Sequence, residues 1–160
     1  MEEIIYKPIG TIHSPFKEVS GMPIQPAGAK GVAGYIEIEP IYTEGLTGLD
    51  GFSHIILIYH FHRSHGYELK VKPFLDDELH GVFSTRAPSR PNPIGISIVK
   101  LIRIEGCTLH IEEVDILDST PLLDIKPYVP SFDVRSADRI GWLAGKAEEA
   151  RGKKADERFI

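Results

Sequence analysis

Alternating isoleucines constrain the fold of this 160-residue chain more than any other feature. From Ile94 to Ile104 isoleucine occupies every second position, and only Lys100 interrupts the series. Side chains two residues apart share one face of a β-strand, so the pattern predicts a long strand with one buried apolar face. The glutamate and glycine that follow predict a tight turn into a second strand over residues 108–116, which completes a hairpin.

Short β-type runs also dominate the rest of the chain. Runs rich in β-branched and aromatic residues lie at 4–13, 34–38 and 54–62. Two helices are predicted, a short one over 41–49 and a longer one over 137–150 with Ser136 as its N-cap. Many short strands without βα alternation favour a compact barrel or sandwich.

The composition is that of a soluble protein with one hydrophobic core. Hydrophobic residues make up 42% of the chain and charged residues 26%. The lone cysteine, Cys107, excludes an internal disulfide framework and fits a reducing compartment. The N-terminus lacks a secretory signal pattern, and no apolar run reaches the ~18 residues of a membrane span. We therefore expect a cytoplasmic protein that does not span a membrane.

A basic, proline-rich segment precedes and overlaps the isoleucine strand. It reads GVFSTRAPSRPNPIGIS at residues 81–97 and carries Arg86 and Arg90. Its three prolines fix their own φ angles and push the residues before them towards extended conformations, which excludes a helix. The net charge of the chain is −5, yet no Asp or Glu occurs between residues 79 and 104. A stiff loop loses little entropy when it holds a ligand, so this segment is a candidate binding loop.

A second stiff segment, DSTPLLDIKPY, follows the predicted hairpin at residues 118–128. Its first four residues predict a turn that presents a carboxylate, hydroxyl groups and backbone groups. Because a hairpin brings its two flanks together, we expect Arg86, Arg90 and Asn92 to lie near the turn that begins at Asp118. The open end of the hairpin is therefore the predicted site.

Two other motifs offer alternative sites. The glycine-rich stretch AGAKGVAG at 27–34 matches neither the Walker pattern nor the dinucleotide fingerprint, so a plain loop is the better interpretation. Three histidines, His60, His62 and His65, could bind zinc, but no cysteine or suitably spaced acidic ligand is near. The alternative role for His62 or its neighbour is a hydrogen bond at the lip of a pocket, and we expect no metal.

Three motifs together resemble one known family. The stretches STRAPSRPNPIG at 84–95 and DSTPLLDIKPY at 118–128, preceded by DGFSHIILIYHFH at 50–62, resemble the TsaA-like, or TrmO, family. That family comprises S-adenosylmethionine-dependent tRNA methyltransferases that act on N6-threonylcarbamoyladenosine beside the anticodon. The similarity runs from about residue 9 to residue 128.

The resemblance implies a mainly β fold. The expected architecture is a small single-sheet β-barrel with a few short helices, including one near the C-terminus. Residues 1–135 would form the barrel domain, and residues 136–160 a helix and tail packed on or extending from it. Family members are usually homodimers with the cofactor near the subunit interface. Many bacterial members carry an additional C-terminal domain, whereas this chain stops soon after the barrel motifs.

The resemblance also implies which residues bind the cofactor, S-adenosylmethionine. These residues are Gln25, Pro26, Ala27, His62, Arg63, Arg86, Ile96, Asp118, Ser119, Thr120 and Pro121. Ser119 stands where glycine is common in the family.

The residues that contact the tRNA and the residue that accepts the proton are less narrowly defined than the cofactor site. Asp118 and His62 are candidates to accept the proton that the substrate nitrogen loses. Candidates for contact with the tRNA are Arg90, Asn92 and Lys126. The alternative function is a non-catalytic barrel that binds S-adenosylmethionine or RNA.

Overall fold

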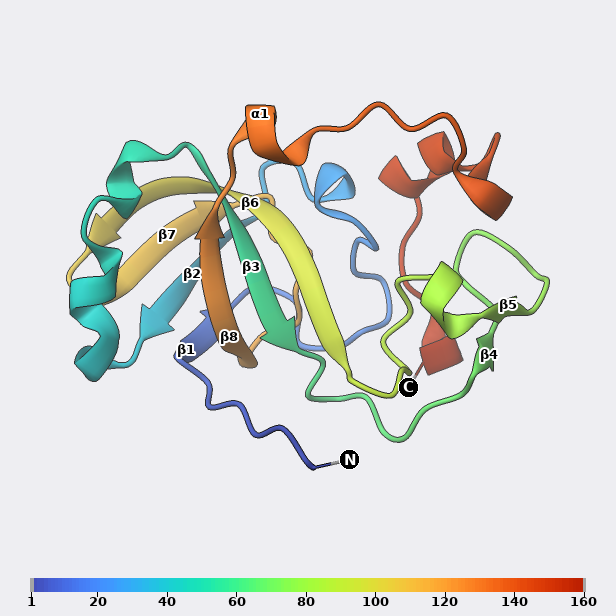
Figure 1. Ribbon diagram of the computed structural model, residues 1–160, viewed down its shortest axis with the longest axis horizontal. Coiled ribbons are helices and arrows are strands. Elements are labelled where there is room, and N and C mark those ends of the chain that lie inside the picture. Colours follow the sequence, from blue (N-terminus) through green and yellow to red (C-terminus); the bar gives the residue numbers. More distant parts are fainter. Residues whose placement is uncertain (1, 160) are drawn as a thin grey trace.

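The computed structural model, which describes residues 2–159, is a closed barrel of six antiparallel strands (Figure 1). The barrel strands are β1 (Gly10–His13), β2 (Ala33–Ile38), β3 (His54–His60), β6 (Ile94–Glu105), β7 (Thr108–Glu112) and β8 (Thr120–Pro127). Their order around the barrel is β1-β2-β7-β6-β3-β8, and β8 closes the circle against β1. The predicted mainly β, single-sheet barrel is therefore confirmed, as is the hairpin of β6 and β7.

Three connections leave the barrel at one end, here called the loop end. Strands β1, β3 and β7 run towards it and β2, β6 and β8 start from it, because every neighbouring pair is antiparallel. The connections 14–32, 61–93 and 113–119 therefore meet there, on the right of Figure 1. The middle connection includes a small separate hairpin of β4 (Lys70–Val71) and β5 (His80–Gly81).

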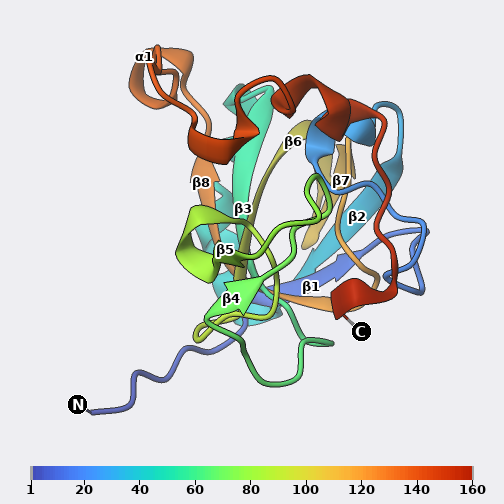
Figure 2. The ribbon, with the colours of Figure 1, turned by 90° about the vertical axis from the view of Figure 1, so that its right-hand side faces the viewer.

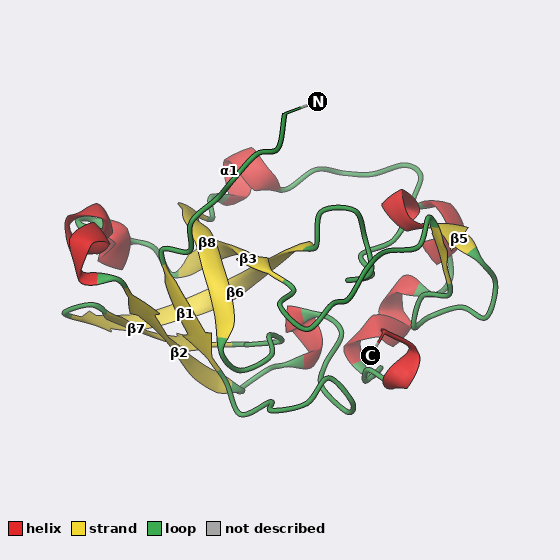
Figure 3. Ribbon diagram, turned by 90° about the horizontal axis from the view of Figure 1, so that it is seen from below, coloured by secondary structure: helices red, strands yellow, loops and turns green. Residues whose placement is uncertain are grey.

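The helical elements are all short. One α-helical turn, α1 (Pro130–Asp133), follows β8, and it confirms the helix expected near the C-terminus. The others are 3-10 turns at Pro26–Gly28, Pro40–Leu46, Leu49–Gly51, Val82–Ser84, Gly141–Leu143, Ala147–Arg151 and Glu157–Phe159. Figure 3 shows the strands gathered on one side and most of the loops and helical turns on the other. No helix in residues 2–159 is long and apolar enough to cross a membrane.

The prediction of one helix over 137–150 is wrong. Two separate 3-10 turns occupy this segment, and Gly141 and Gly145 adopt the left-handed φ values of 58° and 77°. A left-handed residue interrupts the helical hydrogen-bond series, so two such glycines four residues apart divide the segment. The segment instead runs around the loop end, in red in Figure 2.

The isoleucines of β6 lie on the opposite face from the one predicted. Ile96, Ile98 and Ile102 point outward with 55%, 37% and 42% of their surfaces exposed. The alternate residues from Gly95 to Leu101 face the barrel interior and are buried. This side faces inward because the ring of Tyr59 on β3 lies over Gly95, its cross-strand partner, where a larger side chain has no space.

The core is built from the inward faces of all six barrel strands. Its fully buried aliphatic side chains include Ile12, Ile36, Ile55, Leu57, Val99, Leu109, Ile111 and Leu122. A second, smaller cluster under the middle connection joins Val71, Val82 and Ala87, with Phe159 packed against it. The C-terminal segment is thus attached to the fold by apolar contact as well as by backbone hydrogen bonds, such as Ala155 N–H to the Met22 carbonyl at 2.8 Å.

The Gly95→Ala substitution tests the packing of β6 against β3. A Cβ at position 95 would overlap the rings of Tyr59 and Phe61, so we expect a loss of about 1–3 kcal/mol in the free energy of unfolding. The matched control is Gly45→Ala, because a Cβ at Gly45 meets open space and should change stability by less than about 0.5 kcal/mol. Urea denaturation measures both. Equal stabilities of the two variants would contradict this packing.

Candidate functional site

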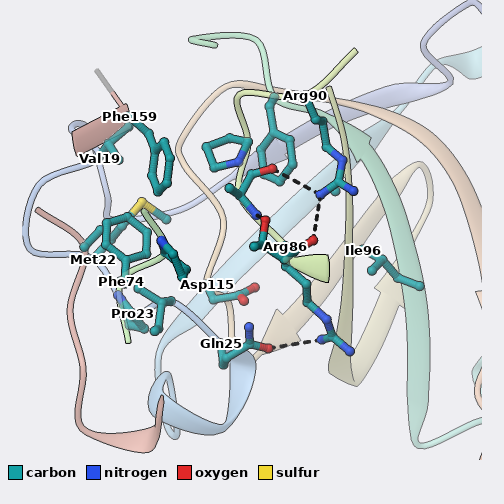
Figure 4. Close-up of a pocket in the computed structure, with 18 of the residues that line it drawn as sticks. Val19, Met22, Pro23, Gln25, Phe74, Arg86, Arg90, Ile96, Asp115 and Phe159 are labelled. Carbon is teal, nitrogen blue, oxygen red and sulfur yellow. Dashed lines mark hydrogen bonds between the residues drawn. The ribbon is translucent and has the colours of Figure 1, made fainter. Parts of the chain in front are cut away.

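A cavity of about 870 Å³ lies at the loop end of the barrel. Its walls come from all three loop-end connections, from the loop-end residues of β3 and β6, and from the C-terminal segment. Figure 4 shows two contrasting parts of this pocket. The labelled apolar part is formed by Val19, Met22, Pro23, Phe74 and Phe159, and the polar part holds Gln25, Arg86, Arg90 and Asp115.

Most of the residues expected at the site line this pocket. They are Gln25, Ala27, His62, Arg63, Arg86, Arg90, Asn92, Ile96 and Thr120. The remaining expected residues, Pro26, Asp118, Ser119, Pro121 and Lys126, are not among its lining residues. The stiff segments on both sides of the hairpin therefore meet. Thr120 is the residue through which the second segment lines the pocket.

The two arginines of the basic segment have different surroundings. Arg90 donates from Nη1 to the carbonyl oxygens of Thr85 and Ala87, both at 3.1 Å, so one of its nitrogens holds the loop in shape. Arg86 is exposed, and its Nη1 donates to Oε1 of Gln25 at 3.2 Å across two connections. Arg86 therefore presents most of its guanidinium to the pocket, while Arg90 is partly used by the backbone.

Hydrogen bonds reinforce the stiffness that the prolines impose on this loop. The buried hydroxyl of Thr85 donates to the Val82 carbonyl at 2.8 Å and accepts from the Ala87 amide at 3.2 Å. Ser64, from the stretch after β3, donates to the Pro88 carbonyl at 3.1 Å. The loop is therefore ordered before any ligand arrives, which lowers the entropy lost on binding.

His62 lies at the pocket wall in a defined protonation state. The Thr120 hydroxyl donates to the Leu117 carbonyl at 2.7 Å, so at 3.3 Å it accepts from Nδ1 of His62. The neutral ring then carries its proton on Nδ1 and leaves Nε2 as an acceptor. Burial, followed by the nearby positive charge of Arg63, lowers the pKa of His62, which keeps this neutral form dominant near pH 7.

Asp118 stabilises the turn rather than facing the pocket. Its carboxylate accepts from Lys17 Nζ at 2.6 Å and from the Ser14 amide at 3.0 Å. Burial alone would raise the pKa of Asp118, but these bonds and one from Ser119 outweigh it and hold the pKa at about 2. Ser119 has a left-handed φ of 63°, which explains why glycine suits that position.

The sequence reasoning missed a buried polar chain beside the pocket. Ser97 Oγ donates to Oδ1 of Asp115 at 2.6 Å, and the Tyr59 hydroxyl lies 3.0 Å from the same Ser97 oxygen. Burial raises the pKa of Asp115 to about 6, against the Ser97 bond and the positive charge of Arg86, which favour the carboxylate. The available signal was a serine on the same strand face as Val99, because a hydroxyl placed in a core needs a partner.

The C-terminal segment forms one wall of the pocket. Trp142 donates from Nε1 to the Ser84 carbonyl at 2.8 Å and stacks on His80 with ring centroids 4.6 Å apart. Lys146 and His80 both reach Asp76, each at 2.9 Å. These contacts fasten the segment to the middle connection, and so to the loop that carries Arg86.

The histidine motif does not form a metal cluster. Within residues 2–159 no group of three or more His, Cys, Asp or Glu side chains is arranged to hold a metal ion. Of the three motif histidines, only His62 lines the pocket.

The fold and the cavity define a class of small antiparallel β-barrel with a pocket at one end. The sheet of this barrel is antiparallel throughout. It therefore offers no parallel βαβ unit of the kind whose glycine-rich turn binds nucleotides in Rossmann folds. The N-terminal-domain model of tRNA-methyltransferase O matches residues 11–134. The chain therefore belongs to the tRNA-methyltransferase O (TrmO) family.

Relatives of known sequence and structure agree with this assignment. A probable S-adenosyl-L-methionine-binding protein of Pyrococcus abyssi is 56% identical over 98% of this chain and 85% of its own length. A mouse tRNA (adenine(37)-N6)-methyltransferase is 38% identical over 81% of this chain, but only 32% of its own length. The crystal structure of TrmO from Pseudomonas aeruginosa superposes with a TM-score of 0.75 at 39% identity, covering 88% of this chain and 62% of that one.

The segment after residue 134 lies outside the family match, although it lines the pocket. A shorter S-adenosyl-L-methionine-binding protein of Archaeoglobus fulgidus is 39% identical over 130 residues, which are 81% of this chain and 93% of that protein. The wall formed by Trp142 and its neighbours is therefore built from residues outside the family match.

Proposed function

We propose that this chain is an S-adenosylmethionine-dependent N-methyltransferase that acts on N6-threonylcarbamoyladenosine next to the anticodon of tRNA. The observation that carries the proposal is the pocket at the loop end. There the residues that the family motifs assign to the cofactor, among them Gln25, His62 and Arg86, come from separate connections into one cavity. The mouse relative's name specifies N6 of adenine 37 in tRNA, which supports this choice of substrate.

The residues of the pocket fit the expected cofactor. S-adenosylmethionine supplies a methyl group on a sulfonium sulfur, and its transfer needs alignment more than a strong nucleophile. Alignment can contribute up to about 7–11 kcal/mol of barrier reduction. Arg86 provides a guanidinium fork for a carboxylate, and the apolar part around Met22 and Phe74 suits an uncharged ring. The ordered proline-rich loop holds these groups in place.

His62 is the better of the two candidates for the proton acceptor. It lines the pocket, its neutral ring dominates near pH 7, and its Nε2 is the unprotonated nitrogen. Asp118 is held by Lys17 and its pKa of about 2 makes it a weak base. We therefore assign His62 as the group that accepts the proton of the substrate nitrogen, directly or through water. Asp118 has a structural role.

The three candidate tRNA contacts divide into two groups. Arg90 and Asn92 lie at the pocket, where the modified base must enter. Lys126 lies near the far end of β8 and pairs with Asp124 at 2.7 Å. Lys126 thus meets a phosphate only where the RNA backbone extends along the outside of the barrel.

The outward isoleucines of β6 support a homodimer. We define the isoleucine stripe as Ile94, Ile96, Ile98 and Ile102, which have 37–55% of their surfaces exposed. Lys100 separates Ile102 from the other three, and an exposed apolar strip such as Ile94, Ile96 and Ile98 on a monomer marks an interaction surface. Ile94 and Ile96 also line the pocket, so a second copy seated on the stripe lies beside the ligand site. This continuity favours a second copy of the chain as the partner.

The alternative function is a barrel that binds S-adenosylmethionine without transferring its methyl group. The names of the relatives from Pyrococcus abyssi and Archaeoglobus fulgidus state binding of S-adenosyl-L-methionine alone, which supports this alternative. Binding without turnover of tRNA distinguishes it from the methyltransferase.

Mass spectrometry of tRNA nucleosides tests the activity. After incubation with the protein and S-adenosylmethionine, we expect threonylcarbamoyladenosine to gain one methyl group. Arg86→Ala should reduce this product about tenfold or more, because a charge-assisted contact is lost. Arg139→Ala is the matched control, since Arg139 is exposed and does not line the pocket. Cofactor binding without any methylated nucleoside would instead favour the binding module.

Sedimentation equilibrium tests the dimer. The wild-type chain should sediment at twice the mass of one chain, and Ile98→Glu should sediment as a folded monomer, because its side chain is not in the core. Ile41→Glu is the control, as Ile41 is 80% exposed in the 3-10 turn at the other end of the barrel. A monomeric wild-type chain, or a dimeric Ile98→Glu variant, would disprove the role of the stripe.

A further inference from the structure

One carboxylate faces the pocket among several arginines. The charged side chains that line the cavity are Arg63, Arg86, Arg90, Arg151 and Asp115. Among the described residues no cation lies within ion-pair distance of Asp115, although these arginines share the cavity with it. The pocket therefore has a positive part and a separate negative group, each without a full protein partner.

The carboxylate of Asp115 is fixed from behind by the buried polar chain. Ser97 uses its proton on Oδ1 of Asp115, so the Tyr59 hydroxyl must be the donor to Ser97. Gly95 makes this chain possible, because any larger residue there would displace the Tyr59 ring. Two positions of the IGIS sequence, a glycine and a serine, thus serve to place Asp115.

The other carboxylate oxygen, Oδ2, is open to the pocket. Apart from the backbone amide of Asp115 itself, Ser97 is the one hydrogen-bond partner of the Asp115 side chain in residues 2–159, and it bonds Oδ1. No buried side-chain oxygen of the described residues lacks a partner, so the unbonded Oδ2 is accessible. Figure 4 shows the carboxylate beside the Gln25–Arg86 pair.

An ionised carboxylate that is mostly withdrawn from water is costly without a positive partner. The protein supplies two neutral hydroxyl donors in series but no paired cation, and it keeps its arginines further away. The missing charge must come from the ligand. Functional sites, unlike cores, retain such uncompensated groups.

We propose that Oδ2 of Asp115 binds a cationic group of the cofactor, so that the pocket recognises a zwitterion. Arg86 takes the carboxylate of the ligand, and Asp115 takes its positive charge. This inference rests on the proposed function, because S-adenosylmethionine carries both an α-ammonium and a sulfonium beside a carboxylate. Either cation satisfies the same oxygen.

The binding of a cation to Asp115 makes cofactor affinity depend on pH. Cation binding favours the ionised carboxylate, so affinity rises as pH rises through about 6, the pKa of Asp115, and levels off above it. The groups packed against Asp115 keep their charge over this range. Arg86 stays protonated, and burial, together with the Asp115 charge, raises the pKa of Tyr59. His62 lines the same cavity with a lowered pKa, so an Asp115 variant is needed to separate the two.

Calorimetric titration with S-adenosylmethionine tests the assignment. Above the pKa of Asp115 we expect Asp115→Asn to weaken binding roughly ten- to a hundredfold, since a charge-assisted bond is lost while Asn still accepts from Ser97. Asp50→Asn is the matched control, as Asp50 is exposed in a 3-10 turn at the far end of the barrel. Melting temperatures establish that both variants fold.

The demethylated product, which lacks the sulfonium, identifies the cation. Weaker binding of both ligands to Asp115→Asn assigns the α-ammonium, and weaker binding of S-adenosylmethionine alone assigns the sulfonium. Unchanged binding of both ligands overturns the inference while leaving the proposed function intact. If the wild-type chain binds neither ligand, the proposed function fails and this inference with it.

Proton release provides a measurement on the wild-type chain that does not depend on the variant. Near pH 6 the unliganded carboxyl is partly protonated, so cation binding should release a proton. Titrations in two buffers of different ionisation enthalpy measure this release. A release that persists in Asp115→Asn would assign the proton to His62 and contradict the role of Asp115.

Discussion

The pairing of β1 with β8 is the interaction on which the rest of the structure depends. The amide of Ile9 donates to the Leu122 carbonyl at 2.8 Å, and Ile12 lies opposite Thr120 across the closure. Without it the sheet would have two open edges, and the turn at Asp118 would not reach the start of the first connection. With it, the amide of Ser14 meets the Asp118 carboxylate at 3.0 Å. Closure of the barrel thus brings segments that are distant in the sequence together at the loop end.

The loop end of the barrel combines core packing with ligand recognition. At the other positions the interior is aliphatic, but here Tyr59, Ser97 and Asp115 carry a chain of hydrogen bonds from the core to the pocket. The proline-rich loop lines the pocket at this point, and the C-terminal segment, anchored to Ser84 by Trp142, forms a further wall. Rigid support behind each polar group is what a binding site requires, because a loosely held group loses much of its interaction energy to entropy.

Local sequence patterns were sufficient to predict the hairpin, the two stiff loops and the contact between these loops, because each depends on neighbouring residues and on one turn. They were not sufficient for the orientation of β6, because a period of two shows which residues share a face but not which face is inside. Tyr59, on another strand, decides that. The apolar spacing at 137–150 resembled a helix, yet two left-handed glycines divide it. Asp115 was missed because its importance arises from Ser97, 18 residues away.

The central claim is that the loop end of the closed barrel is the binding site for S-adenosylmethionine. Backbone amide spectra, recorded by NMR during a titration with this cofactor, test it most directly. The account predicts that the amides of Gln25, Ala87 and Asp115 shift, together with the indole of Trp142, while those of Gly45 and Gly106 at the far end do not. Shifts centred on the far end, or none at all with a folded protein, would contradict it.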